Sequence, residues 1–217
     1  MKKANCLLVA GLLAASGTVQ AQSVFEGLSG NVGVAYQSYE SKFSNFVSAA
    51  TGNGLNVSHG NSTGAVGKLG VDYTWILSSK KTVSVGATYS LNSGSTGPVT
   101  ITTLAGAAVN AGGSTIKTKQ NVGIYVAPGL MLSESTLAYV KLGYVDIKST
   151  DESVKSYSQS SFSYGIGGKF AYDEKSFVYA EANYLAGKKS NHVGGSGSTF
   201  TLKPSGYELV VGYGFKF

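Results

Sequence analysis

The sequence contains one cysteine, three prolines and no arginine, and only 13% of its 217 residues are charged. The single cysteine, Cys6, lies near the N-terminus, which excludes an internal disulfide and a cysteine metal site. All basic residues are lysines, and they sit singly, mostly near predicted turns and loops. Nucleic-acid binding is therefore not indicated, because it usually shows basic residues clustered on one face.

The chain also lacks a long apolar run. After the N-terminus, no stretch approaches the roughly 18 apolar residues of a membrane-spanning helix. Low charge without such a helix is what a β-barrel allows, because each strand needs apolar side chains only at alternate positions. The 30 glycines and 14 tyrosines suit strands, turns and loops. The length allows one barrel domain but not a large second domain.

Residues 1–21 have the pattern of a cleaved signal peptide. Two lysines open the chain, an apolar run follows over residues 7–15, and Ala21 closes a small-residue cleavage site. A membrane anchor is the alternative, but the run is too short to span a bilayer. We expect a mature barrel domain over residues 22–217, with 15 lysines, 11 acidic residues and a net charge of +4.

The last eleven residues, 207–217, alternate between large apolar and mostly small or charged side chains. This period of two indicates a strand with one apolar and one polar face. In an outer-membrane barrel, the last strand pairs with the first and places aromatic side chains at the membrane interface. The ending formed by Tyr213, Phe215 and Phe217 resembles the C-terminal signal that barrel-assembly machinery reads in its clients.

Seven further segments show similar alternation, which predicts eight strands in all. Each has about the length needed to cross a bilayer at a tilt, on the order of 9–11 residues. The predicted strands lie near residues 27–39, 63–76, 82–92, 118–130, 136–148, 161–172, 177–188 and 205–217.

The connections alternate between short turns and long loops. The short turns are 78–81, 133–135 and 173–176, and the long loops lie near 40–62, 93–117, 149–160 and 189–204. This alternation predicts an all-β, eight-stranded antiparallel up-and-down transmembrane β-barrel, with both termini at the periplasmic, short-turn end. For loop 93–117 two interpretations remain open, an extended hairpin and a short helix.

Aromatic residues near the strand ends are predicted to form interface girdles. Tyr and Trp rings favour the headgroup zone, where one edge is wet and the ring body is apolar. The alternative is a soluble barrel or sandwich, which would not need aromatics at both strand ends. The girdle candidates are Tyr36, Tyr73, Trp75, Tyr89, Tyr144, Tyr172 and the terminal Phe217.

Charged residues fall on the strand face opposite the apolar one. A lysine on the lipid side costs roughly 2–4 kcal/mol at mid-depth, so this parity places the charges in the lumen. Asp72, Lys141, Lys169 and Glu181 fall at similar mid-barrel heights, and Lys68 and Glu208 fall nearer the loop end. We interpret the six as a packed ionic plug, because an eight-stranded barrel is only wide enough for side chains to fill it. A narrow ion path is the alternative.

The chemistry of an enzyme is not indicated. His59 and His192 both lie in predicted loops without clustered carboxylates, so no metal site is expected. Ser58 and Ser62 flank His59, but no acid partner is placed near them. No cofactor is expected. The glycine-rich stretch 194–197 lacks the lysine and helix of a phosphate-binding loop.

Taken together, these features resemble the small outer-membrane β-barrel family of the OmpA, OmpX and opacity-protein type. The resemblance covers about residues 27–217 and implies a charged, hydrogen-bonded barrel interior, which Asp72, Lys141, Lys169 and Glu181 match in kind. A C-terminal peptidoglycan-binding domain is not expected. The implied location is the outer membrane of a Gram-negative envelope.

We therefore expect a non-enzymatic integral outer-membrane protein that stabilises the envelope or presents its loops for adhesion and recognition. A small porin-like channel for ions or small solutes is the alternative. A lipid-modifying enzyme is a third hypothesis, which would require His59. The expected partners are outer-membrane lipid, the barrel-assembly machinery and an extracellular ligand of the loops, and we expect a monomer.

Overall fold

A computed structural model describes most of the chain. The described residues are 23–47, 54–58, 62–92, 94–96, 100–103, 108–109, 116–151, 156–193 and 199–217. The predicted signal peptide, residues 1–21, and His59 lie outside them. Within the described residues, thirteen strands form one sheet. Within the described ranges there is no helix that is long and apolar enough to cross a membrane.

Eight of these strands are long and confirm the eight predicted ones. Each predicted range overlaps one observed strand. The long strands are β1 (Gly27–Val47), β3 (Ser62–Ile76), β4 (Lys81–Ser90), β8 (Ile116–Ser133), β9 (Thr136–Asp151), β10 (Ser156–Ala171), β11 (Ser176–Gly187) and β13 (Thr199–Lys216).

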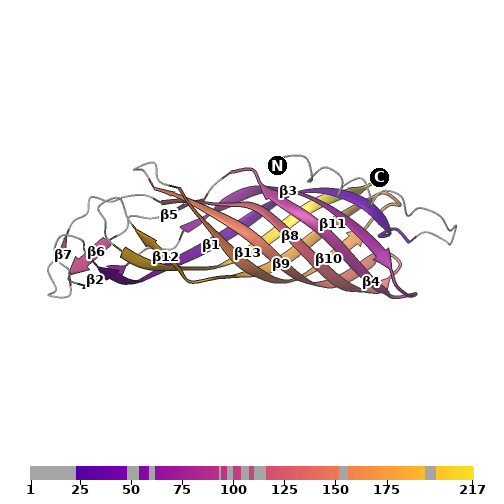
Figure 1. The fold of residues 1–217 in the computed structure, drawn as a ribbon. Helices are drawn as coiled ribbons and strands as arrows, with labels where there is room; N and C mark the ends of the chain where they lie inside the picture. Colours follow the sequence, from indigo (N-terminus) through magenta and orange to yellow (C-terminus); the bar gives the residue numbers. More distant parts are fainter. Residues whose placement is uncertain are drawn as a thin grey trace, which may run out of the picture.

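The eight long strands close into a barrel. Their order is β1–β3–β4–β8–β9–β10–β11–β13, and β13 pairs with β1 to complete the ring. All of these pairings are antiparallel, and the closing pair runs from Ser29 opposite Lys216 to Val47 opposite Thr199. The predicted up-and-down barrel is therefore confirmed (Figure 1).

The short turns lie at one end of the barrel, beside the C-terminus (Figure 1). The Asp173 carboxylate shapes one of them, because its Oδ1 accepts hydrogen bonds from the backbone N–H groups of Lys175 (2.8 Å) and Ser176 (2.7 Å). Hydrogen bonds from backbone N–H groups two and three residues ahead to an aspartate side chain are typical of such turns. These short connections hold adjacent strands in antiparallel register.

The other end carries more strand than the sequence predicted. Four of the eight long strands, β1, β9, β10 and β13, continue by three or more residues into regions that we expected to be loops, and β3 and β8 do so by one or two residues. Further short strands join them and prolong the sheet beyond the closed ring (Figure 1). They are β2 (Gly54–Ser58), β5 (Gly94–Thr96), β6 (Thr100–Thr103), β7 (Ala108–Val109) and β12 (Ser190–Val193).

The reason for this difference lies in the sequence, because these extensions do not continue the apolar alternation of the barrel strands. Where water covers both faces, a strand no longer needs apolar residues at alternate positions, so the period of two disappears while backbone pairing persists. The described part of 93–117 forms strands β5, β6 and β7 and the start of β8, which favours the extended hairpin over the helix. Thr100–Thr103, rich in β-branched residues, pairs with β2.

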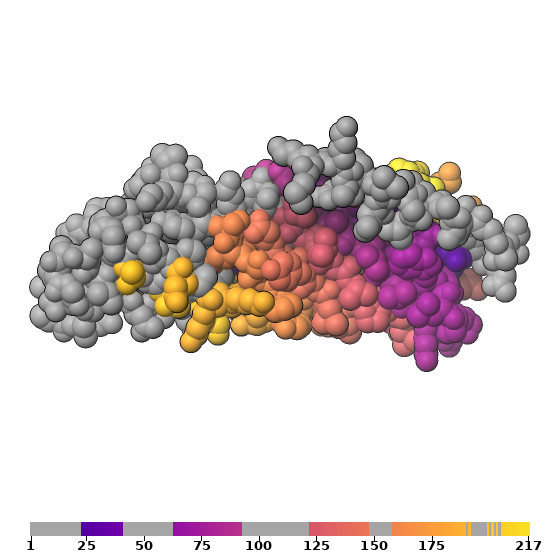
Figure 2. Space-filling view, in the orientation of Figure 1, coloured from indigo at the N-terminus to yellow at the C-terminus, as the bar shows by residue number. Residues whose placement is uncertain are grey.

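The outer face of the barrel is apolar and continuous. Large apolar side chains such as Val34, Ile124 and Ile166 are 56–66% exposed on it. Their neighbours along the same strands face the lumen and are buried or half-buried. In Figure 2, the part of the barrel wall that is coloured and in view shows no opening. The exposed apolar surface is the one that lipid would cover.

The lumen is filled in three layers. At the short-turn end an apolar cluster includes Phe25, Leu137 and Phe177. At the opposite end a second cluster consists of Tyr39, Val145, Ile147 and Leu185. Between them lie buried charged residues from several strands. The barrel interior is therefore a packed core and not an open tube.

Inward-facing glycines make room for the aromatic side chains of this core. A Cβ at Gly167 would lie 2.6 Å from both Cζ and the hydroxyl oxygen of Tyr139. At the neighbouring Gly168, which faces outward, the nearest atom would be the Leu137 carbonyl oxygen at 3.5 Å. Only the first glycine is required by close packing.

We expect Gly167→Ala to destabilise the folded barrel by about 1–3 kcal/mol, because the added methyl group displaces the Tyr139 ring. Gly168→Ala is the matched control and should leave the stability nearly unchanged. Urea unfolding in lipid vesicles measures both. Equal stability of the two variants would contradict the packing described here.

Candidate functional site: the ionic network in the lumen

One ion pair crosses the whole width of the lumen. Lys169 Nζ on β10 lies 2.7 Å from Asp72 Oδ1 on β3. These strands are on opposite sides of the barrel, because three strands separate them in either direction around the ring. Asn31 Nδ2 donates to Asp72 Oδ2 at 3.3 Å, and the ammonium of Lys169 lies 4.8 Å from the centroid of the Phe177 ring. Two buried side chains therefore tie opposite walls together.

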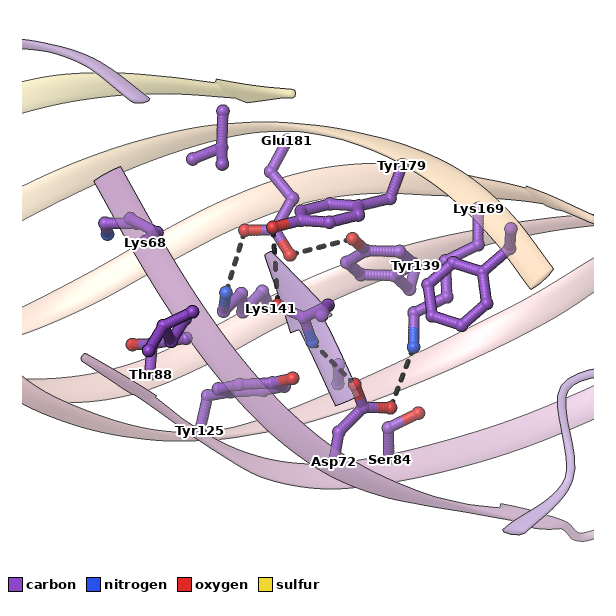
Figure 3. A pocket seen from close by; sticks show the side chains of 15 residues that line it. Lys68, Asp72, Ser84, Thr88, Tyr125, Tyr139, Lys141, Lys169, Tyr179 and Glu181 are labelled. Carbon is purple, nitrogen blue, oxygen red and sulfur yellow. Dashed lines mark hydrogen bonds and ion pairs between the residues drawn. The ribbon is translucent and has the colours of Figure 1, made fainter. Parts of the chain in front are cut away.

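A second ion pair joins strands on either side of β10. Lys141 Nζ lies 2.8 Å from Glu181 Oε2, and the Tyr139 hydroxyl donates to Glu181 Oε1 at 2.8 Å. Lys141 also lies over the face of Tyr125, 4.2 Å from the ring centroid. The carboxylate is thus shared between an ammonium and a phenol, as Figure 3 shows.

A third pair lies towards the end of the barrel opposite the short turns, which we call the outer end. There, Lys68 Nζ lies 2.6 Å from Glu208 Oε1. Gln37 Nε2 donates to the other oxygen of Glu208 at 2.8 Å. Asn183 Nδ2 lies between two pairs, 3.3 Å from Glu208 Oε1 and 3.2 Å from Glu181 Oε2. The second and third pairs are therefore parts of one hydrogen-bonded network.

The six predicted lumen residues thus meet as three lysine–carboxylate pairs. Three positive and three negative charges cancel, which is the condition for burying ions without a large loss of hydration. The cavity between them has room for about one water molecule. Its lining includes Lys68, Asp72, Tyr125 and Glu181. The arrangement fills the lumen and leaves no space in this layer for a dissolved solute.

The neutral partners of these charges were not predicted from the sequence. Asn31, Gln37, Asn183 and Tyr139 all lie on the inward parity of their strands, and that parity was the available signal. Inward polar residues have to be hydrogen-bonded when buried. Which carboxylate each one serves depends on barrel width and register, neither of which is visible in a single strand.

An N-terminal cap was also missed. Residues 23–26 fold back at the short-turn end, and Phe25 is only 6% exposed within the apolar cluster there. Lys216 Nζ donates to the Ser23 carbonyl at 3.2 Å, and the Ser23 hydroxyl lies 3.8 Å from Met131 Sδ. The segment before β1 therefore closes the mouth of the barrel that lies beside the short turns.

The girdle candidates lie on the outer face at two levels. Tyr73, Trp75 and Tyr172 lie near the short turns, and the Tyr73 and Trp75 ring centroids are 4.6 Å apart. Tyr36, Tyr89 and Tyr144 lie in the outer half and expose between 40% and 56% of their surface. The outer level also holds members that the sequence analysis did not assign to it, which are Phe162, Tyr164, Tyr184 and Tyr207.

Outside the lumen, the described structure gathers no chemical site. Among the described residues, no group of three or more His, Cys, Asp or Glu side chains could hold a metal ion. Of the two histidines, His192 falls on the short edge strand β12. The described residues that combine charge with burial are those of the lumen network.

A known protein family matches nearly the whole chain. The family described as outer membrane protein β-barrel domain matches residues 7–217. The chain belongs to this family. As a member, this outer-membrane barrel is an integral membrane protein of the Gram-negative outer membrane, with its apolar face in lipid. A search of curated protein sequences found no significant match.

Solved structures resemble the barrel at low sequence identity. OprG from Pseudomonas aeruginosa is 14% identical, with a TM-score of 0.58, and the alignment covers 92% of this chain and 99% of OprG. The protease OmpT from Escherichia coli is 10% identical, with a TM-score of 0.50 and coverage of 89% and 97%. Ail, the attachment invasion locus protein of Yersinia pestis, is 17% identical, with a TM-score of 0.47 and coverage of 88% and 99%. At such identities, the likeness to OprG and OmpT shows the fold alone.

The ion pair between Lys169 and Asp72 should contribute to the stability of the folded barrel. We expect Lys169→Met to cost about 3–5 kcal/mol, because it leaves the Asp72 carboxylate buried without a counter-charge. Adding Asp72→Asn should recover most of that loss. Equilibrium unfolding of the wild type, both single variants and the double variant forms the thermodynamic cycle, and Lys175→Met in an exposed turn is the control. Additive effects in the cycle would contradict the pairing.

Proposed function

We propose that this outer-membrane barrel is a non-enzymatic, non-conducting scaffold that presents its outer strands for adhesion or recognition. The observation that carries the proposal is the lumen, which is filled by a charge-neutral network between two apolar layers. Conduction needs a continuous wet path, and this packing supports a plug. The porin-like channel is the competing function.

The extended outer wall supports the recognition role. On one side of the barrel the sheet continues as β12–β13–β1–β2–β6–β7 beyond the closed ring. A rigid membrane-embedded base that holds variable outer segments is a common way to position binding residues. The barrel contributes stiffness, and an extracellular ligand would meet the outer strands and the segments between them. No cofactor is part of this function, and the scaffold acts as a monomer.

We also propose that the barrel-assembly machinery reads the C-terminal strand. Tyr213 and Phe215 lie on the outer face of β13, and Phe217, which follows the last residue of the strand, is 76% exposed. The Phe215 and Phe217 rings pack edge to face with centroids 5.9 Å apart. The backbone N–H of Phe217 donates to the Leu28 carbonyl at 3.0 Å, so the signal lies at the seam where the barrel closes.

Planar-bilayer recording separates scaffold from channel. We expect the refolded protein to be silent, and Lys141→Met to lose folding stability without gaining conductance, because Glu181 then lacks its ammonium partner. Heat-dependent gel mobility shows that each sample contains folded barrel. Steady wild-type openings, or a selective rise in conductance of a normally stable Lys141→Met barrel, would contradict the proposal and favour the channel.

A further inference from the structure

Lysines that are scattered in the sequence come together on the outer surface of the barrel. β11 pairs with β13 up to Ala186 opposite Ser205, and β12 resumes the pairing at Ser190 opposite Leu202. Lys188 and Lys189 therefore lie between these two points, beside Lys203 on β13. The side chains of all three lysines are exposed.

A fourth lysine continues this group onto the next strand. The Cα of Lys42 on β1 is the ladder partner of Lys203. We call Lys188, Lys189 and Lys203 the lysine patch, and the backbone of Lys42 lies beside it. Across residues 38–44, 184–193, 201–207 and 156–162, Glu40 is the one acidic residue against four lysines, and Asp146, the ladder partner of Ser160, follows on β9. The patch therefore carries a clear positive charge.

The height of the patch matches a lipid headgroup. Lys188 and Lys203 each lie four residues beyond a tyrosine, Tyr184 and Tyr207, whose ring centroids are 5.2 Å apart on the lipid face. Four residues span about 13 Å along a strand, or roughly 10 Å along the membrane normal at the tilt of a barrel strand. The aromatic rings mark the boundary between acyl chains and headgroups. The lysine backbones therefore lie just outside the acyl layer.

One lysine reaches back to that boundary. Lys188 Nζ lies 5.3 Å from the centroid of the Phe162 ring, which belongs to the outer aromatic level. Its backbone N–H is anchored on the Ser160 carbonyl at 3.4 Å. The three lumen ion pairs do not include Lys188, Lys189 or Lys203. An ammonium is thus held at the level of lipid phosphates.

We propose that the lysine patch binds the phosphate groups of an anionic lipid in the outer leaflet, with the acyl chains of that lipid resting against Tyr184 and Tyr207. A lipid is favoured over a soluble partner because the patch faces sideways and continues into the aromatic surface that lipid covers. Clustered lysines next to a membrane attract anionic headgroups through additive electrostatic contributions. The site is independent of whether the lumen conducts.

The test compares two triple variants of the mature chain in phosphatidylcholine nanodiscs. The probe is diphosphorylated lipid A, and native mass spectrometry counts the bound molecules. Lys188→Gln/Lys189→Gln/Lys203→Gln should weaken retention of the probe by about tenfold or more. Lys80→Gln/Lys81→Gln/Lys175→Gln, which removes three exposed lysines from the opposite rim, should retain it as the wild type does. The corresponding Lys→Arg triple variant of the patch should restore binding.

Two results would overturn the proposal. One is equal retention by the two Gln variants, whether both keep the probe or both lose it, since either outcome removes the patch as the determinant. The other concerns the wild type alone. It is retention of dephosphorylated lipid A as strongly as of the diphosphorylated form. Heat-dependent gel mobility confirms that every sample is folded before it is analysed.

Discussion

The pairing of β13 with β1 is the constraint on which the rest of the structure depends. A sheet inside a bilayer has no water to satisfy an unpaired edge, so its first and last strands have to meet. The register from Ser29 opposite Lys216 to Val47 opposite Thr199 does this along the full height of the wall. With eight strands in the ring, that closure also sets the width of the lumen.

The narrow width decides what the interior can contain. Side chains from facing walls meet, as the Lys169–Asp72 pair demonstrates, and every inward position has to be filled or left to a glycine. Charged groups are acceptable there because each one has a counter-ion and further hydrogen-bond partners such as Asn183. The apolar layers above and below, with Phe25 at the short-turn end, complete a solid cylinder. The same closure that removes a sheet edge thus accounts for the sealed interior on which the proposed scaffold role rests.

Much of this barrel follows from the sequence, because strand parity is a local property. Alternation separated the apolar face from a face bearing Lys68, Asp72 and Glu208, and it located the eight strands. Partner choice did not follow, since it depends on which strands lie opposite each other in the closed ring. The outer strand extensions and the Phe25 cap did not follow either. The apolar alternation is not continued in the first, and the second depends on a tertiary contact of a short irregular segment.

The most direct test of the sealed lumen is the distance across it. Dipolar recoupling by solid-state NMR, on the protein in lipid bilayers with labelled lysine and aspartate, measures the separation of Lys169 Nζ and Asp72 Cγ. An ion pair with an N–O distance of 2.7 Å predicts a nitrogen–carbon separation of about 4 Å or less. A Lys169 ammonium that shows no coupling to Asp72, and that exchanges freely with bulk water, would contradict a lumen closed by paired charges.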